Sequence, residues 1–514
     1  MMRAGAAGLA LLTFLVLLFL ATSPARAIEP GALRDKIAAT IDTLNLGLTR
    51  EQGATYSYDA IEVEPRDDHF RVNITGLEVL MDGGDGTRLL VGTAAFTMHP
   101  AGELAGDGVY RVSDAEIPNT MGVVYGDGSP QAGVRMGDFS LDALWSFAYL
   151  TTLSLDLAVD DIEIVAPSNQ EVVGVRSVVA DVRTDQKAGD RYDVVLNMQI
   201  DELAGGDESG GIEVGKMVWL SRITDYDLAA AAALYGEIRE ALKQQATPEE
   251  QTANMIDLMF TKDFWRVDSE TQIGIKNLRA SDNTDDSEVT LDSMELGFIL
   301  EDANQALART SFGFNQSGLK VVGGGPSVQS PLAQGLMPEE SAFQLDIDRL
   351  PLKEIVALLS SMANQAMLAE QTPEGQEGGF EAMMLPLVFQ LNQLMTEAGT
   401  VLTIRDSGVQ TSLASLDMAG TFDVDPQAAY GVKGGLLANL LGLDALLQAA
   451  QQAMSSEDQE LQDFALNVML ALGSLQAYTD RSETDGQVID RYDLKVEPSG
   501  LISVNGQPLL PAAQ

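Results

Sequence analysis

YDVVLNMQI, residues 192–200, decides the fold class of this chain, because every second residue from Tyr192 to Ile200 is apolar. Most of the residues between them are polar. Successive side chains of a β-strand point to opposite faces, so this pattern indicates a strand with one buried face and one face in water. The same alternation recurs at residues 70–74, 343–347 and 492–496. We therefore predict a mostly antiparallel sheet.

Two longer apolar patterns shift their phase by one residue, at residues 155–164 and 289–300. A one-residue shift within a strand moves the following side chains to the other face unless the backbone bulges or bends. We therefore expect the sheet to be long and curved.

The bulk composition narrows the classes of protein that are possible. The chain has 514 residues, enough for two or three domains, and no cysteine that could form a disulfide or serve as a thiol nucleophile. It carries 31 basic against 76 acidic residues, a net charge of −45. Such a surface repels phosphate backbones, which makes nucleic acid a poor partner. Two interpretations of the acids stay open: a solubilising shell, or a binding surface for a cationic partner.

The first residues have the pattern of a secretory signal peptide. Arg3 precedes an uncharged run at residues 4–25, and Ala25 and Ala27 occupy the small-residue positions before a cleavage site. We expect residues 1–27 to be removed and the protein to reach the periplasm. The alternative is an uncleaved inner-membrane anchor, since the run approaches the roughly 20 residues of a spanning helix. We expect no membrane span after the signal sequence.

The second half of the chain shows an internal repeat of about 90 residues. A Ser-Gly pair stands between two strand-like arms three times, with the glycines at Gly318, Gly408 and Gly500. Glycine supplies the positive φ of a tight hairpin turn, so we predict a hairpin at each. A pair of helices is predicted before each hairpin, at 228–243 with 248–262, 351–369 with 380–397, and 435–454 with 458–473.

These elements define the expected architecture. A leading helix at residues 31–46 and a strand-rich stretch form an N-terminal domain at 28–225, and residues 226–514 form the region of strand, helix pair and hairpin repeats. The fold class is α+β: a long curved, mostly antiparallel sheet with three helix pairs packed on one face.

Residues that could carry chemistry are few. Asp423 and Asp425, in the stretch SLASLDMAGTFDVDP at 412–426, alternate with apolar residues, which places them on the solvent face of a strand and not in a calcium loop. The two histidines, His69 and His99, are interpreted as separate surface residues, too few for a zinc site without cysteine. We predict no catalytic residue, no cofactor, no metal site and no enzymatic activity.

The strongest functional signal is the apolar content of the predicted helices. At helical spacing, Leu437, Leu440, Leu441 and Leu447 fall on one broad face, which is the candidate face for an apolar ligand. Packing into the core is the alternative. We expect a non-catalytic envelope protein that binds an apolar or lipid-like ligand, or an envelope partner, between sheet and helices. The other hypothesis is a structural or assembly factor without a small ligand.

The C-terminal third also resembles a known family. GTFDVDP at 420–426, GVKGG at 431–435, an apolar helix pair and the ending GQPLLP at 506–511 are similar to the YdgA-like exported bacterial envelope proteins. The resemblance covers residues 340–514. It implies extended sheets with flanking helices in the cell envelope, and it supplies no catalytic residues.

Overall fold

The structure is a computed structural model. It describes residues 29–47, 54–81, 86–101, 108–147, 149, 151–166, 171–207, 209–244, 266–325, 328–370, 379–484 and 486–510.

The chain divides into two compact units. Unit 1 comprises residues 1–207 and 213–265, and unit 2 comprises residues 208–212 and 266–514. The domain boundary predicted at residue 225 lies near the end of the strand β12 (Gly210–Asp227), in a stretch assigned to unit 1.

Unit 1 is built from long strands and two described helices. The leading helix predicted at 31–46 is confirmed as α2, and the helix predicted at 228–243 is confirmed as α3, where Asp227 Oδ1 accepts a hydrogen bond from the amide of Ala230 at 2.8 Å. The elements are α2 (Pro30–Gly47), β1 (Ala54–Ser57), β2 (Ala60–Pro65), β3 (Phe70–Met81), β4 (Arg88–Pro100), β5 (Val109–Glu116), β6 (Thr120–Val124), β7 (Pro130–Arg135), β8 (Phe139–Ser146), β9 (Thr151–Val165), β10 (Glu171–Gln186), β11 (Arg191–Asp207), β12 and α3 (Leu228–Gln244).

The strand pairs described here for unit 1 are all antiparallel. β3 pairs with β1, β2 and β4. The sheet then splits, because β4 pairs with β5 toward one end and with β6 toward the other. These branches continue into β8 and β7, and both rejoin on β9, which is followed by β10 and β11.

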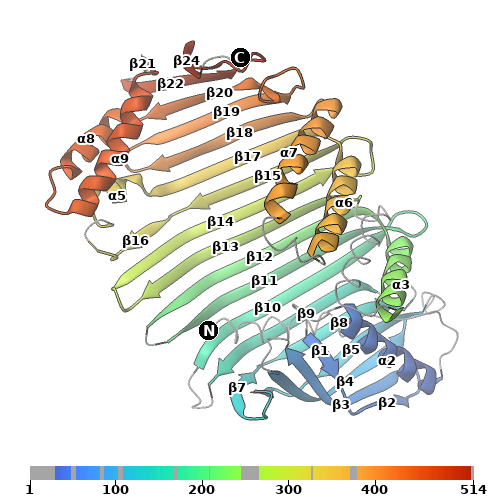
Figure 1. The fold of residues 1–514 in the computed structure, drawn as a ribbon. Helices are drawn as coiled ribbons and strands as arrows, with labels where there is room; N and C mark the ends of the chain where they lie inside the picture. The colour runs from blue at the N-terminus through green and yellow to red at the C-terminus, as the bar shows by residue number, and fades with distance from the viewer. Residues whose placement is uncertain are drawn as a thin grey trace. The chain divides into compact units, whose positions relative to one another are not determined.

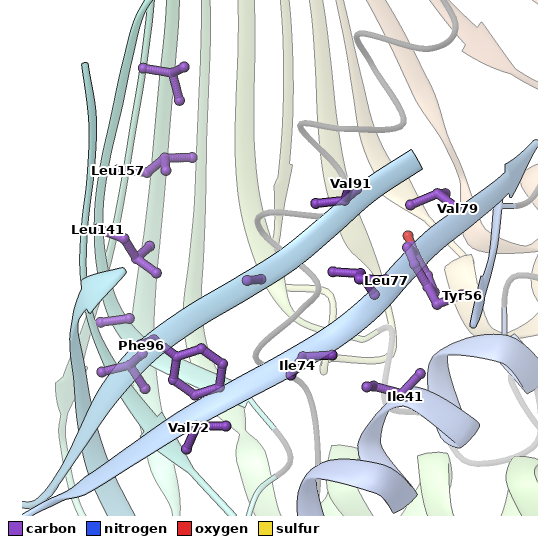
Figure 2. Packing of buried hydrophobic residues seen from close by; sticks show 14 of the residues in the cluster. Ile41, Tyr56, Val72, Ile74, Leu77, Val79, Val91, Phe96, Leu141 and Leu157 are labelled. Carbon is purple, nitrogen blue, oxygen red and sulfur yellow. The ribbon is translucent and has the colours of Figure 1, made fainter. Parts of the chain in front are cut away.

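One hydrophobic core occupies unit 1, and α2 closes it. Buried side chains from β1, β3, β4, β8, β9 and β10 belong to the same cluster as Leu33, Ile37 and Ile41 of α2. Figure 2 shows side chains from α2, β1, β3, β4, β8 and β9 lying close together in this cluster. A sheet whose distant strands share one core must bend over its own apolar face. The apolar side chains of the alternating strands therefore fill the interior of this unit.

The phase shift predicted at 155–164 is confirmed. Asp161 has a left-handed φ of 49°, and the apolar side chains before and after it, including Val159 and Ile162, are all buried. In unit 2, the shift at 289–300 faces Asn277, whose φ is 53°, on the partner strand. Asp and Asn tolerate this backbone conformation better than other non-glycine residues, so they mark where a strand changes phase.

The strands of unit 2 are antiparallel, with helices inserted between them (Figure 1). Its elements are β13 (Asp268–Asp282), β14 (Ser287–Glu301), β15 (Ala308–Ser317), β16 (Lys320–Val322), α5 (Pro331–Leu336), β17 (Pro338–Leu350), α6 (Leu352–Glu370), α7 (Gly379–Ala398), β18 (Val401–Thr411), β19 (Ser415–Val424), β20 (Val432–Leu441), α8 (Leu443–Ala453), α9 (Gln459–Gln476), β21 (Asp480–Thr484), β22 (Gln487–Val496), β23 (Ile502–Val504) and β24 (Gln507–Leu510).

The strands of unit 2 follow one another in a nearly simple meander. β13, β14, β15, β17, β18, β19, β20 and β22 pair in that order. β16 extends the pairing of β14, and β21 and β23 both pair with β22, with β24 following β23. Together with the described helices, this confirms the α+β class and the mostly antiparallel sheet.

The inserted helices leave the sheet of unit 2 at opposite strand ends. Asp348 pairs with Val401, so α6 and α7 depart and return at the end where β19 finishes. Leu441 pairs with both Ser415 and Ile489, so α8 and α9 depart and return at the other end. Figure 1 shows α6 with α7 and α8 with α9 at these two ends. Since β19 has ten residues, the two ends are about 30 Å apart.

Three sequence predictions for this region are wrong, and one lies outside the described residues. The helix predicted from residue 435 begins only at Leu443, and the residues before it form β20. Gly500 lies in a hairpin turn between β22 and β23, with a φ of 79°. Gly318, whose φ is 71°, lies between β15 and β16, which both pair with β14 and form no hairpin with each other. Gly408 lies within β18, beside a bulge at Asp406. The helix predicted at 248–262 falls outside the described residues. A run that is apolar on both faces has no periodicity to separate strand from helix, which explains the error at 435.

Candidate functional site

One face of the sheet in unit 2 is mostly apolar. The register places the apolar residues of neighbouring strands directly opposite one another, so that Leu296 pairs with Ile273 on one side and with Phe314 on the other. We call this surface the apolar face. Its members include Ile273, Ile275, Leu291, Met294, Leu296, Phe298, Leu300, Phe312, Phe314, Phe343, Leu345, Ile347, Leu402, Ile404, Leu416, Met418, Phe422, Leu436 and Leu440.

The centre of the apolar face is open to solvent. Phe298 is 45 % exposed, Phe312 is 40 % exposed and Ile273 is 39 % exposed. A strand residue facing a closed core would be almost fully buried, as the core residues of unit 1 are. Burying the exposed part of one such phenylalanine would contribute about 2 kcal/mol. The centre of this face is therefore available for a contact that the described residues do not supply.

Four phenylalanines form a ladder at this open centre. Phe298 pairs directly with Phe312 across β14 and β15, and Phe314 pairs directly with Phe343 across β15 and β17. The ring centroids of Phe312 and Phe343 lie 6.3 Å apart with the planes tilted by 54°. We call Phe298, Phe312, Phe314 and Phe343 the phenylalanine ladder. The ladder is not among the sites predicted from the sequence, although each of its members lies in a stretch of alternating apolar residues.

The end of the apolar face under α8 and α9 is closed. Leu440 and Tyr492 of the sheet are buried together with Leu443, Leu446 and Leu472 of the two helices. A second cluster joins α5, α8 and α9 through Leu332, Ala450, Ala453, Leu461 and Ala465. This end of the unit is therefore solid core.

The four leucines selected from the sequence do not share one helical face. Leu437, Leu440 and Leu441 lie in the strand β20, and only Leu447 lies in a helix, α8. Leu440 and Leu447 pack in the closed end, whereas Leu437 and Leu441 lie on the opposite face of the sheet. The prediction of a common helical face is wrong because the chain changes from strand to helix at Gly442, whose φ is 86°.

The opposite face of unit 2 is more polar. Ser293 and Ser317 hydrogen-bond through their hydroxyls at 2.8 Å, and Ser311 Oγ donates to Asp346 Oδ1 at 2.7 Å. A shallow cavity of about 730 Å³ lies around the β18 bulge and is bordered by Glu340, Asp406 and Leu437, among others. No histidine, lysine or arginine lines it, so it offers no pair of acid and base for proton transfer.

Asp423 and Asp425 are placed differently. Asp423 is an exposed strand residue, as predicted, whereas the side chain of Asp425 is only 15 % exposed and lies just after β19. Its carboxylate contacts Lys433 Nζ at 2.8 Å and accepts a hydrogen bond from the amide of Gln427 at 2.8 Å. These two contacts lower the pKa of Asp425. The residue stabilises the turn between β19 and β20.

This contact predicts a pH-dependent effect of Asp425→Asn. A carboxylate whose pKa is lowered on folding stabilises the native state above its unfolded pKa of about 3.9, and the stabilisation disappears as the pH falls through the folded value. We expect Asp425→Asn to lower the melting temperature slightly at pH 7, with the difference shrinking below pH 4. Asp423→Asn is the matched control and should change nothing. Melting curves at pH 7, 4 and 3 test this, and a stabilisation of the wild type by calcium that Asp425→Asn abolishes would contradict it.

The other residues singled out in the sequence are two histidines and two alanines. His69 and His99, interpreted as separate, lie side by side with their ring centroids 4.8 Å apart. Ala25 and Ala27 lie outside the described residues.

Among the helices that the structure describes, none combines the length and the hydrophobicity needed to cross a membrane.

No protein-family model, no curated protein and no solved structure matches this chain.

Proposed function

We propose that this chain is a non-catalytic, exported protein of the bacterial cell envelope that binds an apolar, lipid-like ligand on the apolar face of unit 2. The observation that carries the proposal is the phenylalanine ladder at the centre of a mostly apolar sheet face, with Phe298 and Phe312 about half exposed. Exposed apolar patches of this kind on a folded domain mark binding surfaces. Export to the periplasm and membership of the YdgA-like family remain part of the proposal.

The dimensions of the face support an elongated ligand. Eight strands from β13 to β22 extend for about 34 Å across the sheet, and the helix pairs lie about 30 Å apart along the strands. One leaflet of a bilayer contributes about 15 Å of hydrocarbon, so an acyl chain fits in either direction. No titratable side chain belongs to the ladder, which suits recognition by shape and hydrophobicity.

We further propose that α6 with α7 and α8 with α9 border the same face and that a third helix pair includes α3. For α8 and α9, the supporting observation is their packing against Leu440 and Tyr492. For α7, it is the approach of Asn392 to Gly431, where an added Cβ would collide with the asparagine side chain. In Figure 1 both pairs lie in front of the strands of unit 2. Helices at both ends would turn the apolar face into a trough.

A structural or assembly factor is the second candidate, and one observation favours it. The helices also expose apolar side chains, with Phe389 of α7 66 % exposed and Leu470 of α9 65 % exposed. A protein partner in the envelope would cover such helical surfaces, whereas a ligand on the sheet would not need them.

Binding of a neutral fluorescent probe, N-phenyl-1-naphthylamine, tests the proposal. The change is the double variant Phe298→Ser with Phe312→Ser, and we expect probe binding to weaken by at least about tenfold, because each ring would contribute about 2 kcal/mol. More than half of each ring is buried, so the double variant should also lower the denaturant midpoint, and probe binding is compared under conditions in which both proteins stay folded. Native mass spectrometry of protein extracted from the periplasm should also show a bound lipid that the double variant lacks.

The control variant is Ile299→Ser. Ile299 follows Phe298 in β14, lies on the opposite face and is 37 % exposed, so it matches the ladder in exposure but not in position. Equal probe binding by wild type and the double variant would reject the ligand site on this face. A co-purifying envelope protein without any lipid would then favour the assembly factor.

A further inference from the structure

The two histidines of the chain meet at one point on unit 1. His69 immediately precedes β3, and His99 lies at the end of β4. Phe70 pairs with Met98 in the antiparallel register, which places His69 opposite His99. Their ring centroids are 4.8 Å apart and the planes are tilted by 38°. The chain contains only these two histidines, 30 positions apart, so their meeting depends on the register of one strand pair.

An acid completes this group. Asp68 Oδ1 lies 2.8 Å from His69 Nδ1, and one potential ligand atom from each of Asp68, His69 and His99 lies within 4.8 Å of the others. A tetrahedral zinc ion with bonds of about 2.1 Å separates its ligand atoms by about 3.4 Å. Small side-chain rotations therefore bring the three atoms into one coordination sphere. The side chain of Asp68 is 80 % exposed and that of His69 is 29 % exposed, so both are free to adjust.

The surroundings favour a cation. Arginines close in sequence or register to the histidines are paired with acids: Arg66 with Glu64 at 2.6 Å, Arg71 with Glu116 at 2.7 Å and Arg111 with Asp142. Their positive charges are thus largely compensated close to the histidines. The strongly acidic chain as a whole raises the local concentration of cations. A cavity of about 910 Å³ bordered by His99 gives access from solvent.

We propose that Asp68, His69 and His99 form a binding site for a divalent transition-metal ion that prefers imidazole ligands, of the class of Zn²⁺ and Cu²⁺. Two imidazole nitrogens and one carboxylate oxygen are a ligand set for these ions, and carboxylate-rich sites without nitrogen suit Mg²⁺ or Ca²⁺ instead. Three ligands from the chain leave a coordination position open toward solvent. The site lies in unit 1 and is independent of the ligand proposed for unit 2.

The presence of only two histidines makes the test direct. The imidazole region of the NMR spectrum contains two ring systems, which single variants assign. We expect ZnCl₂ to shift both rings together and CuCl₂ to broaden both together, with one ion per chain measured by isothermal titration calorimetry. His69→Gln and His99→Gln should each weaken zinc binding by at least about tenfold, because each variant removes one of the three proposed ligands.

Asp67→Asn serves as the matched control for Asp68→Asn, because it removes the same charge from the adjacent position outside the group. We expect Asp68→Asn to weaken binding and Asp67→Asn to leave it unchanged. Zinc binding that persists in both histidine variants, or that leaves both wild-type rings unshifted, would overturn the proposal and assign the ion to surface carboxylates. The wild-type NMR titration decides the question even where a variant folds poorly.

Discussion

Leu440→Ala is expected to lower the free energy of unfolding of unit 2 by about 2–5 kcal/mol, the range for truncating a buried leucine. Leu440 is 8 % exposed and belongs to the cluster that joins the sheet to α8 and α9. Removing its side chain leaves a cavity between Tyr492 and the two helices, which the surrounding side chains fill only in part.

Leu441→Ala is the matched control. The two leucines are adjacent in β20, but Leu441 lies on the other face of the strand and is only half-buried. We expect this substitution to cost about 1 kcal/mol or less, since little packed surface is lost.

The measurement must report on unit 2 alone. All three tryptophans, Trp145, Trp219 and Trp265, precede residue 266, so tryptophan fluorescence follows unit 1 and serves as an internal reference. Hydrogen exchange of peptides covering β20 and β22, in a denaturant series, reports on the affected strands. Equal losses for the two variants would show that Leu440 and Leu441 are not on different faces and would contradict the assignment of residues 432–441 to a strand.

Arg481→Met is expected to destabilise the same region by about 2–4 kcal/mol, because it leaves a buried carboxylate without its counter-charge. Asp490 is 1 % exposed and pairs with Leu440 in the sheet. Its oxygens accept hydrogen bonds from Arg481 at 2.8 Å and 3.1 Å and from Thr479 Oγ1 at 2.9 Å. The lower end of the range allows for the partial exposure of Arg481, which brings water near the pair.

Arg279→Met provides the comparison for this prediction. Arg279 contacts Glu288 at 2.7 Å in the hairpin of β13 and β14, but both partners are substantially exposed. Ion pairs of that kind contribute about 0–1 kcal/mol. Hydrogen exchange of β21 and β22 peptides measures Arg481→Met, and exchange of β13 and β14 peptides measures Arg279→Met, both read against the same tryptophan reference. If Arg481→Met costs no more than Arg279→Met, the buried carboxylate is satisfied without the arginine.

Much of the secondary structure could be predicted from local pattern. The alternation at residues 192–200 predicted a strand that became part of β11, and the helices predicted at 351–369 and 380–397 correspond to α6 and α7. These predictions succeeded because hydrophobic periodicity depends on which residues are near in sequence. The stretch from Gly434 failed because Leu436 and Leu440 face one side of β20 while Leu437 and Leu441 face the other, which leaves no period to read.

The two glycines at the start of β20 have a structural role that the hydrophobic pattern did not predict. Gly434 has a φ of 152°, and an added Cβ would collide with the carbonyl of Thr421 on β19. The two glycines at 434 and 435 are therefore explained by close strand pairing.

The sequence by itself determined which side chains share a face where apolar and polar residues alternate clearly, and with it the antiparallel sheet. The tertiary structure decided which of those side chains are neighbours. The meeting of His69 with His99, and of Phe298 with Phe312, depends on the register between paired strands. The physical reason is that alternation repeats every two residues and is the same for many registers, whereas a site needs one particular register.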